Sequence, residues 1–169
     1  MGEVSGAKMT AALDLATKDS ENGKKTAAVL SLETGGVRLQ EANLGPAAIA
    51  ELIASLLALR QHAPIITVIA GTVGCFGGMS LAAGLSSYII MTPEARLGLN
   101  GAKVIEQESG IEEFDSSDRA LIWAIYGGEQ RVGVGVADEL VIDDAPKFRR
   151  CCPAICEGRP AFGTSQRTS

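Results

Sequence analysis

Apolar and polar positions along the chain follow two alternating patterns. Short, continuous apolar runs at residues 27–32, 65–70 and 87–92 are typical of parallel strands whose two faces are both covered. Residues 139–142 form one more such run, and residues 96–101 predict a short strand that ends in a tight turn. The segments between these runs have helical spacing, so the pattern predicts an α/β fold.

Six helices are predicted around these strands. Pro46 stands in the first turn of one helix, the position that proline prefers, and the apolar face of this helix continues to Arg60. Ser117 or Asp118 is predicted to cap a helix over residues 119–126. The other helices are predicted over residues 4–18, 79–85, 102–107 and 129–136.

The first predicted helix has its apolar side chains unevenly distributed. Val4, Ala7, Ala11 and Leu15 lie near one face, with Ala12 beside them, and charged residues lie near the other. Because a surface helix buries its apolar stripe, we expect this face to pack on the rest of the domain.

Two of the predicted strands are followed by Gly-rich turns that contain glycine pairs. The first strand leads to Gly35 and Gly36, and the second leads to Gly77 and Gly78, where a helix of small residues begins. Such turns leave backbone N–H groups uncovered, and these can hold an anion or stabilise an oxyanion, each donor contributing about 10²–10³ in rate. The alternative is that the glycines only allow a helix to pack closely on the sheet.

Composition and charge narrow the possible functions. The chain has 169 residues, 46% of them hydrophobic, which suits one domain with a sizeable core. Acidic residues exceed basic ones by 20 to 15, and the net charge of −5 argues against a nucleic-acid partner, which requires a clustered basic face.

Cysteine usage and hydropathy predict a cytoplasmic protein without a metal site. Cys75 falls in a predicted core turn, Cys151, Cys152 and Cys156 fall near the C-terminus, and the single histidine, His62, is distant in sequence. Structural zinc sites take four suitably spaced ligands, so reduced thiols are expected instead. Neither an apolar run of about 20 residues nor a secretion signal occurs, so no membrane association is expected.

Other common reaction types lack their sequence signals. No Gly-x-Ser-x-Gly turn occurs, and His62 lies just before Pro64, so nucleophilic hydrolysis is disfavoured. No Gly-Lys-Ser/Thr follows a glycine run, and Gly71, Gly74 and Gly77 lack the spacing of a dinucleotide site. The main-chain donors at the glycine pairs are therefore the candidate chemistry.

Several motifs resemble those of a known family. Residues 34–41, Thr-Gly-Gly-Val-Arg-Leu-Gln-Glu, and 101–107, Gly-Ala-Lys-Val-Ile-Glu-Gln, resemble the Ser-Gly-Gly-Ala-Arg-x-Gln-Glu and Gly-Pro-x-Val-Ile-Glu-Gln motifs of acyl-CoA carboxylase carboxyltransferase subunits, members of the crotonase superfamily. Four further segments resemble a narrower group, the beta subunits of biotin-independent malonate decarboxylases. These segments are residues 41–45, 74–79, 98–101 and 110–115.

The resemblance covers residues 2–144 and implies a crotonase-like ββα spiral. Members of the family carry a β-rich segment before the helix that here begins at Gly2, and residues after Asp144 do not resemble their C-terminal helix. We therefore expect residues 1–145 to form a crotonase-like domain that is incomplete at its N-terminus. Residues 146–169 have no apolar periodicity and are predicted to be a flexible tail.

What the resemblance implies about function is a decarboxylase that works as an assembly. The chain would pair with a homologous gamma subunit and decarboxylate a malonyl thioester to an acetyl thioester and CO₂ through an enolate. The acyl group would be carried on a phosphopantetheine-type arm of an acyl carrier subunit, with no cofactor bound directly by this chain.

The matching motifs also imply site residues. Gly35, Gly36 and the N–H of Val37 are the candidate oxyanion donors on the first turn, and Gly77 and Gly78 are the candidates on the second. The residues implied for substrate binding are Arg38, Met79, Asn100 and Gly101.

Alternatives remain open at this point. Arg38 can instead form a structural ion pair with Glu41 across the turn, and Glu106 is expected to cap a helix or contact a subunit rather than act as an acid. The chain as a whole can also be a carboxyltransferase subunit of a biotin-dependent acyl-CoA carboxylase, or a non-catalytic assembly subunit.

Overall fold

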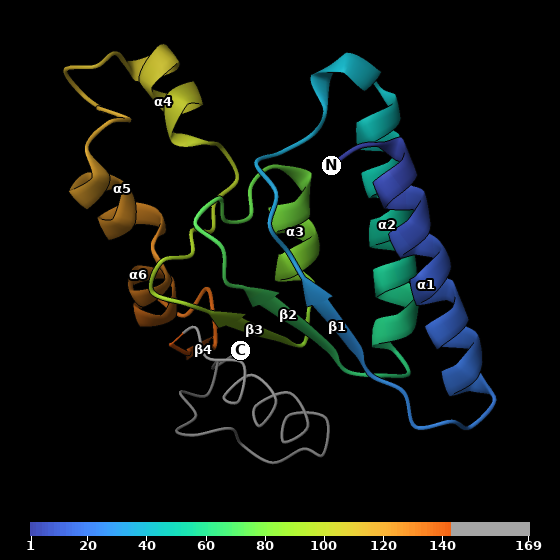
Figure 1. The fold of residues 1–169 in the computed structure, drawn as a ribbon. Helices are drawn as coiled ribbons and strands as arrows, with labels where there is room; N and C mark the ends of the chain where they lie inside the picture. The colour runs from blue at the N-terminus through green and yellow to red at the C-terminus, as the bar shows by residue number, and fades with distance from the viewer. Residues whose placement is uncertain (143–169) are drawn as a thin grey trace.

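The computed structural model describes residues 1–142 as an α/β fold with a parallel sheet. The strands of this part of the chain, in hydrogen-bonded order, are β1 (Ala28–Ser31), β2 (Ile65–Ile69), β3 (Tyr88–Met91) and β4 (Glu139–Leu140) (Figure 1). Their positions confirm the four apolar runs as strands. The predicted flexible tail, residues 146–169, and its three cysteines lie outside the described residues and stay a prediction.

The prediction of strands covered on both faces is confirmed for β2, all of whose residues are buried, but is wrong for β1, in which Val29 is 53% exposed. Ile65 and Ile69 of β2 and Ile89 of β3 belong to a large core cluster with the side chains of α2 and α3, whose bounds follow below. The side chains of Ile66 and Val68, also in β2, point to the opposite face of the sheet. They form a second cluster with residues of β3 and of the segment after β4. This alternation places successive β2 side chains on opposite faces of the sheet.

The helices form a pair on one side of the sheet and a lobe on the other side of the molecule. The paired helices are α1 (Glu3–Glu21) and α2 (Leu44–Arg60), with the short 3₁₀ helix η1 (Leu39–Glu41) before α2 (Figure 1). Beside the sheet lies α3 (Gly78–Gly84), and the lobe contains α4 (Ala102–Ser109), α5 (Arg119–Tyr126) and α6 (Gly128–Gly133). The predicted cap of α5 is confirmed, since the Asp118 side chain accepts a hydrogen bond from the Leu121 N–H at 3.1 Å.

The predicted buried face of α1 is wrong. Val4 and Leu15 are 64% and 65% exposed, and the predicted alanines Ala7, Ala11 and Ala12 are exposed as well. The buried face instead contains Gly6 and Leu13. A Cβ added at Gly6 would lie 2.6 Å from the Cβ of Ala48 in α2, so the glycine allows the two helices to approach closely. Backbone proximity, rather than the largest apolar side chains, determines the buried face.

Residues 96–101 do not form the predicted short strand. Leu97 makes an isolated parallel bridge to Cys75, and Arg96 makes an isolated antiparallel bridge to Gly127. Each side of this segment thus pairs with a different part of the chain, and no continuous ladder forms. The bridges place the segment beside the turn that follows β2.

The lobe is attached to the sheet through an aromatic cluster. Phe76, from the segment after β2, packs with Ile122 and Tyr126 of α5, and the rings of Phe76 and Tyr126 meet edge to face at 5.7 Å. Of the helices within residues 1–142, none combines the length and the apolar character needed to cross a bilayer.

Candidate functional site

The two glycine turns predicted from the sequence lie against each other. The first turn covers residues 34–38, and the second turn covers residues 71–78. The Thr34 N–H donates to the Gly74 carbonyl at 2.8 Å, and the Phe76 N–H donates to the Thr34 carbonyl at 3.0 Å. Figure 1 shows the segment between β1 and η1 beside the N-terminal end of α3. These two hydrogen bonds extend the pairing of β1 and β2 into the turns, and so fix one turn relative to the other.

Glycine backbone also lies against glycine backbone where the two turns meet. A Cβ added at Gly77 would lie 3.3 Å from the Gly36 Cα and 4.0 Å from the Val37 nitrogen. Gly36 has φ +128° and Gly77 has φ +67°, a region that favours glycine. Glycine is therefore needed at Gly36 for its conformation and at Gly77 for both conformation and space.

The N–H groups of the turns differ in whether they are engaged. Among residues 1–142, the N–H groups of Gly35, Val37 and Gly78 have no hydrogen-bond acceptor. The Gly36 N–H makes only a long bond of 3.4 Å to the Thr34 hydroxyl. Val37 and Gly78 come from different turns, so the arrangement offers donors from both sides of one junction.

The donor predicted at Gly77 needs correction. Its N–H donates to the carbonyl of Leu99 at 2.8 Å and is engaged. This bond also explains the placement of Asn100 and Gly101, which follow Leu99 and lie in the loop beside the second turn. Asn100 is exposed and Gly101 half-buried, so both stay candidates for substrate contact.

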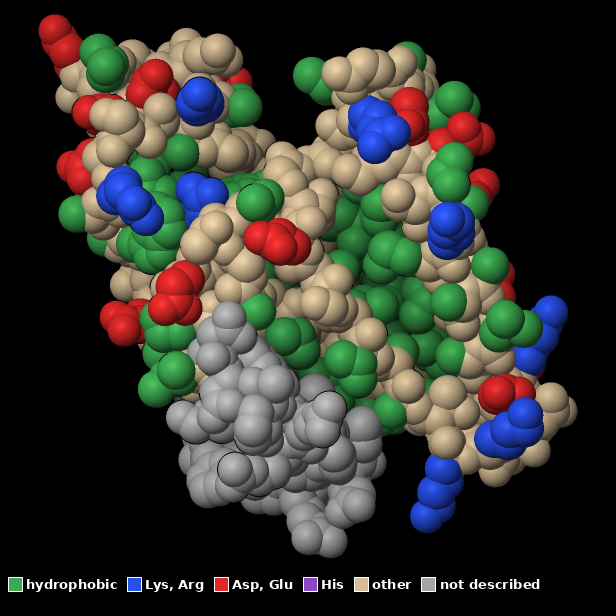
Figure 2. Space-filling model, in the orientation of Figure 1, with side chains coloured by type: hydrophobic (Ala, Val, Ile, Leu, Met, Phe, Trp, Pro, Cys, Tyr) green, Lys and Arg blue, Asp and Glu red, His purple; other side chains and the backbone are tan. Residues whose placement is uncertain are grey.

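Figure 2 shows the surface hollowed between the lobe of α4 and α5 and the corner formed by η1 and the start of α2. In the same orientation, the segment after β1 and the N-terminal end of α3 lie at the base of this hollow. The candidate donors are thus placed where an extended substrate arm could reach them.

Arg38 forms the ion pair that was the alternative to substrate binding. Its Nη1 lies 3.2 Å from Glu41 Oε1, and its side chain is 65% exposed. The Glu41 carboxylate also accepts a hydrogen bond from the Glu3 N–H at 2.6 Å, which ties the turn to the start of α1. A substrate contact of Arg38 stays a prediction.

Met79 is almost completely buried. Its side chain is 1% exposed and belongs to the main core cluster with Leu32 of the segment after β1. Because Gly78 begins α3 and Met79 follows on the inward face of this helix, the side chain packs beneath the turn. This burial indicates core packing, but Met79 also lines a pocket with Met1 and Thr34, and a substrate contact of Met79 stays a prediction.

Two ionisable residues noted in the sequence have structural roles. Burial raises the pKa of the Cys75 thiol to about 12, so the thiol stays protonated at neutral pH and is a poor nucleophile. The Glu106 carboxylate accepts a hydrogen bond from the Ser116 N–H at 2.6 Å and braces the loop after α4. No three His, Cys, Asp or Glu side chains within residues 1–142 are grouped so that they could hold a metal ion.

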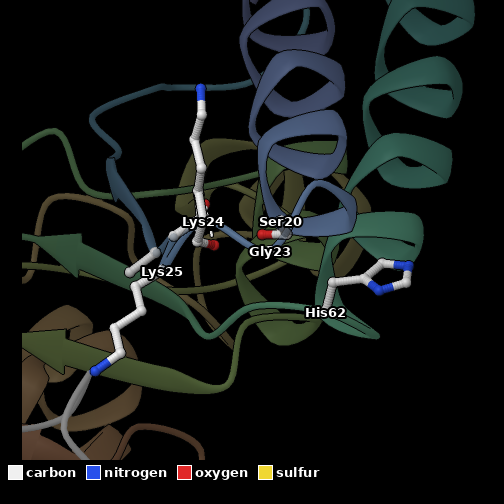
Figure 3. Close-up of a pocket in the computed structure, with 7 residues that line it drawn as sticks. Ser20, Gly23, Lys24, Lys25 and His62 are labelled. Carbon is white, nitrogen blue, oxygen red and sulfur yellow. Dashed lines mark hydrogen bonds between the residues drawn. The ribbon is translucent and has the colours of Figure 1, made fainter.

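His62 lies away from the glycine turns, in a pocket of about 690 Å³ near the start of β1. Ser20, Gly23, Lys24 and Lys25 line the same pocket, and the His62 ring points away from the two lysines (Figure 3). Since the glycine turns follow the other end of β1, this pocket is separate from the candidate site.

Sequence reasoning missed two side chains that contact the second turn. The Glu33 carboxylate accepts a hydrogen bond from the Val73 N–H at 3.3 Å, and the Arg96 guanidinium donates to the Thr72 carbonyl. The signal that could have found Glu33 is its position directly after the first strand. Arg96 had no comparable signal, because its bridge to the turn depends on the fold.

Comparisons with known proteins find carboxyltransferases and malonate decarboxylase chains similar to this one. Malonyl-S-ACP:biotin-protein carboxyltransferase MADC of Malonomonas rubra is 42% identical over 167 residues, which is 93% of this chain and 52% of that protein. A chain of a Pseudomonas malonate decarboxylase hetero-tetramer in complex with malonate is 55% identical with a TM-score of 0.91, over 100% of this chain and 61% of that one. No protein-family model matches the chain.

Two further structures bear on family and fold. A chain of the Pseudomonas malonate decarboxylase MdcD-MdcE hetero-dimer is 52% identical with a TM-score of 0.84, over 98% of this chain and 68% of that one. Transcarboxylase 12S, at 24% identity and a TM-score of 0.75, has the same fold. The chain spans about half the length of the carboxyltransferase MADC. These relatives confirm the resemblance seen in the motifs, and the chain belongs to the family of malonate decarboxylase subunits, which is related to the carboxyltransferases of the crotonase type.

Proposed function

We propose that this chain is the beta subunit of a malonate decarboxylase and that, with a homologous gamma subunit, it converts a malonyl thioester to an acetyl thioester and CO₂. The acyl group is carried on a phosphopantetheine-type arm of an acyl carrier subunit, which reaches the hollow above the glycine turns. The Pseudomonas relatives are hetero-oligomers, which supports a function in an assembly rather than alone.

The observation that carries the proposal is the junction of the two turns, where the N–H groups of Val37 and Gly78 have no acceptor among the described residues. In decarboxylation, the bond between the carboxylate carbon and the α-carbon breaks, CO₂ leaves, and the electron pair forms an enolate with negative charge on the thioester oxygen. A proton from water then adds to the α-carbon. Donors placed where this charge develops stabilise the transition state more than the substrate.

A carboxyltransferase function is the second candidate, favoured by the relative whose name describes transfer from malonyl-S-ACP to a biotin protein. Both reactions pass through the same enolate, so the same donors serve either one. They differ in the fate of the carboxyl group, which is released in the first and bound to biotin in the second. A non-catalytic assembly subunit is the third possibility.

The experiment compares Gly36→Val with Gly23→Val in the complex co-expressed with gamma and carrier subunits. Both glycines have positive φ, +128° and +79°, and a Cβ added at either one meets no atom within 4 Å. Both changes therefore strain the backbone, the strain being larger at Gly36, whose φ lies further from the left-handed region, and Gly23 lies at the other end of β1. We expect Gly36→Val to lower turnover of the malonyl carrier by about 10² or more, because the donors lose their alignment.

The control separates chemistry from assembly. Gly23→Val should assemble and turn over like the unmodified complex. If Gly36→Val assembled and turned over at the unmodified rate, the oxyanion assignment would be wrong and the assembly-subunit function would be favoured. Malonyl carrier labelled in its free carboxyl group distinguishes the two enzymes: release of labelled CO₂ without a biotin protein supports the decarboxylase, whereas label retained until a biotin protein is added supports the carboxyltransferase.

A further inference from the structure

The four-residue turn Gly71–Gly74 lies between two charged side chains that hold its backbone from different sides. The turn closes on itself, since the Gly74 N–H donates to the Gly71 carbonyl at 3.0 Å. The Gly74 carbonyl accepts the Thr34 N–H, and the polar backbone groups of Thr72 and Val73 contact Arg96 and Glu33. The turn leads through Cys75 and Phe76 to the second glycine pair, Gly77 and Gly78.

Arg96 holds the carbonyl side of the turn. Its Nε and Nη2 donate to the Thr72 carbonyl at 3.0 and 2.8 Å, and Nη2 lies 3.5 Å from the Val73 carbonyl. The guanidinium carbon lies 4.9 Å from the Trp123 ring centre and 5.7 Å from that of Phe76, so the planar group is oriented by two aromatic rings. Within residues 1–142 no carboxylate pairs with Arg96, and its hydrogen bonds are made to this turn.

Glu33 holds the amide side of the turn. Its Oε1 accepts the Val73 N–H at 3.3 Å, and in the described part of the chain it pairs with no basic side chain. Gly71 makes room for this carboxylate, because a Cβ added there would overlap the Glu33 Oε1. Gly74 leaves room for Arg96, because a Cβ added at Gly74 would overlap the backbone carbonyl of Arg96. The turn is therefore shaped to fit both residues.

The two side chains connect the segments that build the candidate site. Glu33 directly precedes Thr34, which is bonded to Gly74, and the Arg96 carbonyl accepts the Cys75 N–H at 2.8 Å. The first turn, the second turn and the segment before α4 are thus joined at one place by side chains as well as by backbone.

We infer that Glu33 and Arg96 are positioning residues for the reaction: they fix the turn Gly71–Gly74 and thereby the placement of the Gly78 N–H relative to the Val37 N–H. This inference rests on the proposed function and names the residues that align its donors. Neither side chain acts on the substrate itself. Their effect should appear in the transition state, where donor placement counts, rather than in binding of the carrier.

The test uses Glu33→Ala, Arg96→Met and the double variant in the full complex with gamma and carrier subunits. We expect each single change to lower kcat for the malonyl carrier about tenfold with KM changed by less than about threefold, because a misplaced donor weakens the transition state selectively. Since both residues hold one turn, the double variant should lose well under the hundredfold product, about 10- to 30-fold.

The kcat values of conservative variants distinguish a positioning role from a general loss of stability. Glu33→Gln keeps an acceptor oxygen at the same position and should retain kcat within about twofold. Arg96→Lys keeps the positive charge but loses the planar guanidinium, which donates two hydrogen bonds to one carbonyl and lies against two aromatic rings. We therefore expect Arg96→Lys to lower kcat as much as Arg96→Met does. Exposed Glu51→Ala and Arg60→Met in α2 are the matched controls and should retain the unmodified kcat.

Amide hydrogen exchange tests the contact without any assay of activity. In Glu33→Ala and Arg96→Met, peptides covering residues 71–78 should exchange about tenfold faster, while peptides of α2 should not change. Unchanged exchange of residues 71–78 in both variants overturns the inference, as does an effect confined to KM.

If the unmodified complex does not turn over malonyl carrier, the proposed function fails. A normal kcat in both variants of an active complex rejects the positioning role alone.

Discussion

The first and second glycine turns use glycine for different reasons. In the first turn, Gly36 has φ +128° and an added Cβ would meet no atom within 4 Å. In the second turn, a Cβ at Gly74 would overlap the Arg96 backbone, and one at Gly78 would lie 2.9 Å from two atoms of Ile49. Conformation alone is the constraint in the open turn, whereas the closed turn adds a constraint of space, since Gly74 and Gly77 have positive φ and Gly74 and Gly78 are also crowded by neighbours. Changes in the closed turn should therefore cost stability, and changes in the open turn should mainly affect chemistry.

The largest effect is expected from Gly74→Ala. Gly74 and Gly23 have nearly the same φ, +78° and +79°, but only Gly74 is crowded by a neighbouring backbone. We expect Gly23→Ala to lower the free energy of unfolding by about 1 kcal/mol, from backbone strain, and Gly74→Ala to lower it by about 3 kcal/mol or more. Denaturant unfolding of the assembled protein measures both. Equal losses would show that the second turn is not closed.

Gly78→Val tests the closed turn against α2. Its side chain would overlap Ile49, and overpacking of this kind costs about 1–3 kcal/mol. The cost should fall by about 1 kcal/mol or more when the change is made in an Ile49→Ala background, because the smaller residue leaves room. Gly84→Ala, in the same helix but with no atom within 4 Å, is the control and should leave the melting temperature unchanged or slightly higher. Additive losses would contradict the packing argument.

Cys75 makes the closed turn sensitive to high pH. Burial raises the pKa of its thiol from the ordinary 9.0 to about 12, so above pH 9 the unfolded chain loses this proton while the folded chain keeps it. The free energy of unfolding should therefore fall as pH rises above 9, by about 1.4 kcal/mol per pH unit from this group. The difference in unfolding free energy between the unmodified protein and Cys75→Ala should shrink between pH 9 and pH 10.5. A difference independent of pH would mean that the thiol is accessible.

The smallest effect is expected from Arg38→Ala in the open turn. Its ion pair with Glu41 is largely exposed on the arginine side, and exposed pairs contribute about 0–1 kcal/mol. We expect a loss of stability below about 0.5 kcal/mol and a modest fall in turnover. Steady-state kinetics decide between the two roles of Arg38. A large rise in KM for the carrier alone would indicate contact with the substrate arm and would contradict a purely structural pair.

The strands and the positions of both turns could be predicted from the sequence, because they depend on local signals, whereas the contrast between the turns depends on tertiary contacts with Arg96 and Ile49. The apolar runs identified the strands, and the glycine pairs at their ends identified both turns. A cap at Ser117 or Asp118 was predicted from residue type alone, and the bond from the Leu121 N–H identifies Asp118 as the cap. These features depend on residues close in sequence.

The errors arose where tertiary contacts decide the outcome. On α1, the close approach of Gly6 to Ala48 determined the buried face, although Val4 and Leu15 are larger and more apolar. The engagement of the Gly77 N–H depends on the Leu99 carbonyl, which the fold supplies from a distant loop. No local pattern indicates which N–H groups will find partners of this kind.

The bridges that join Thr34 to Cys75 and Cys75 to Leu97 have a consequence for folding. Each bridge connects segments separated by a complete helical crossover, and contacts of such long sequence separation form slowly because loop closure must precede them. The strands can pair only after these crossovers have been made, and the turns meet only at the ends of the paired strands. Recovery of the site during refolding should therefore lag behind recovery of helical signal, and turnover after dilution from denaturant would measure the last contacts of the fold to form.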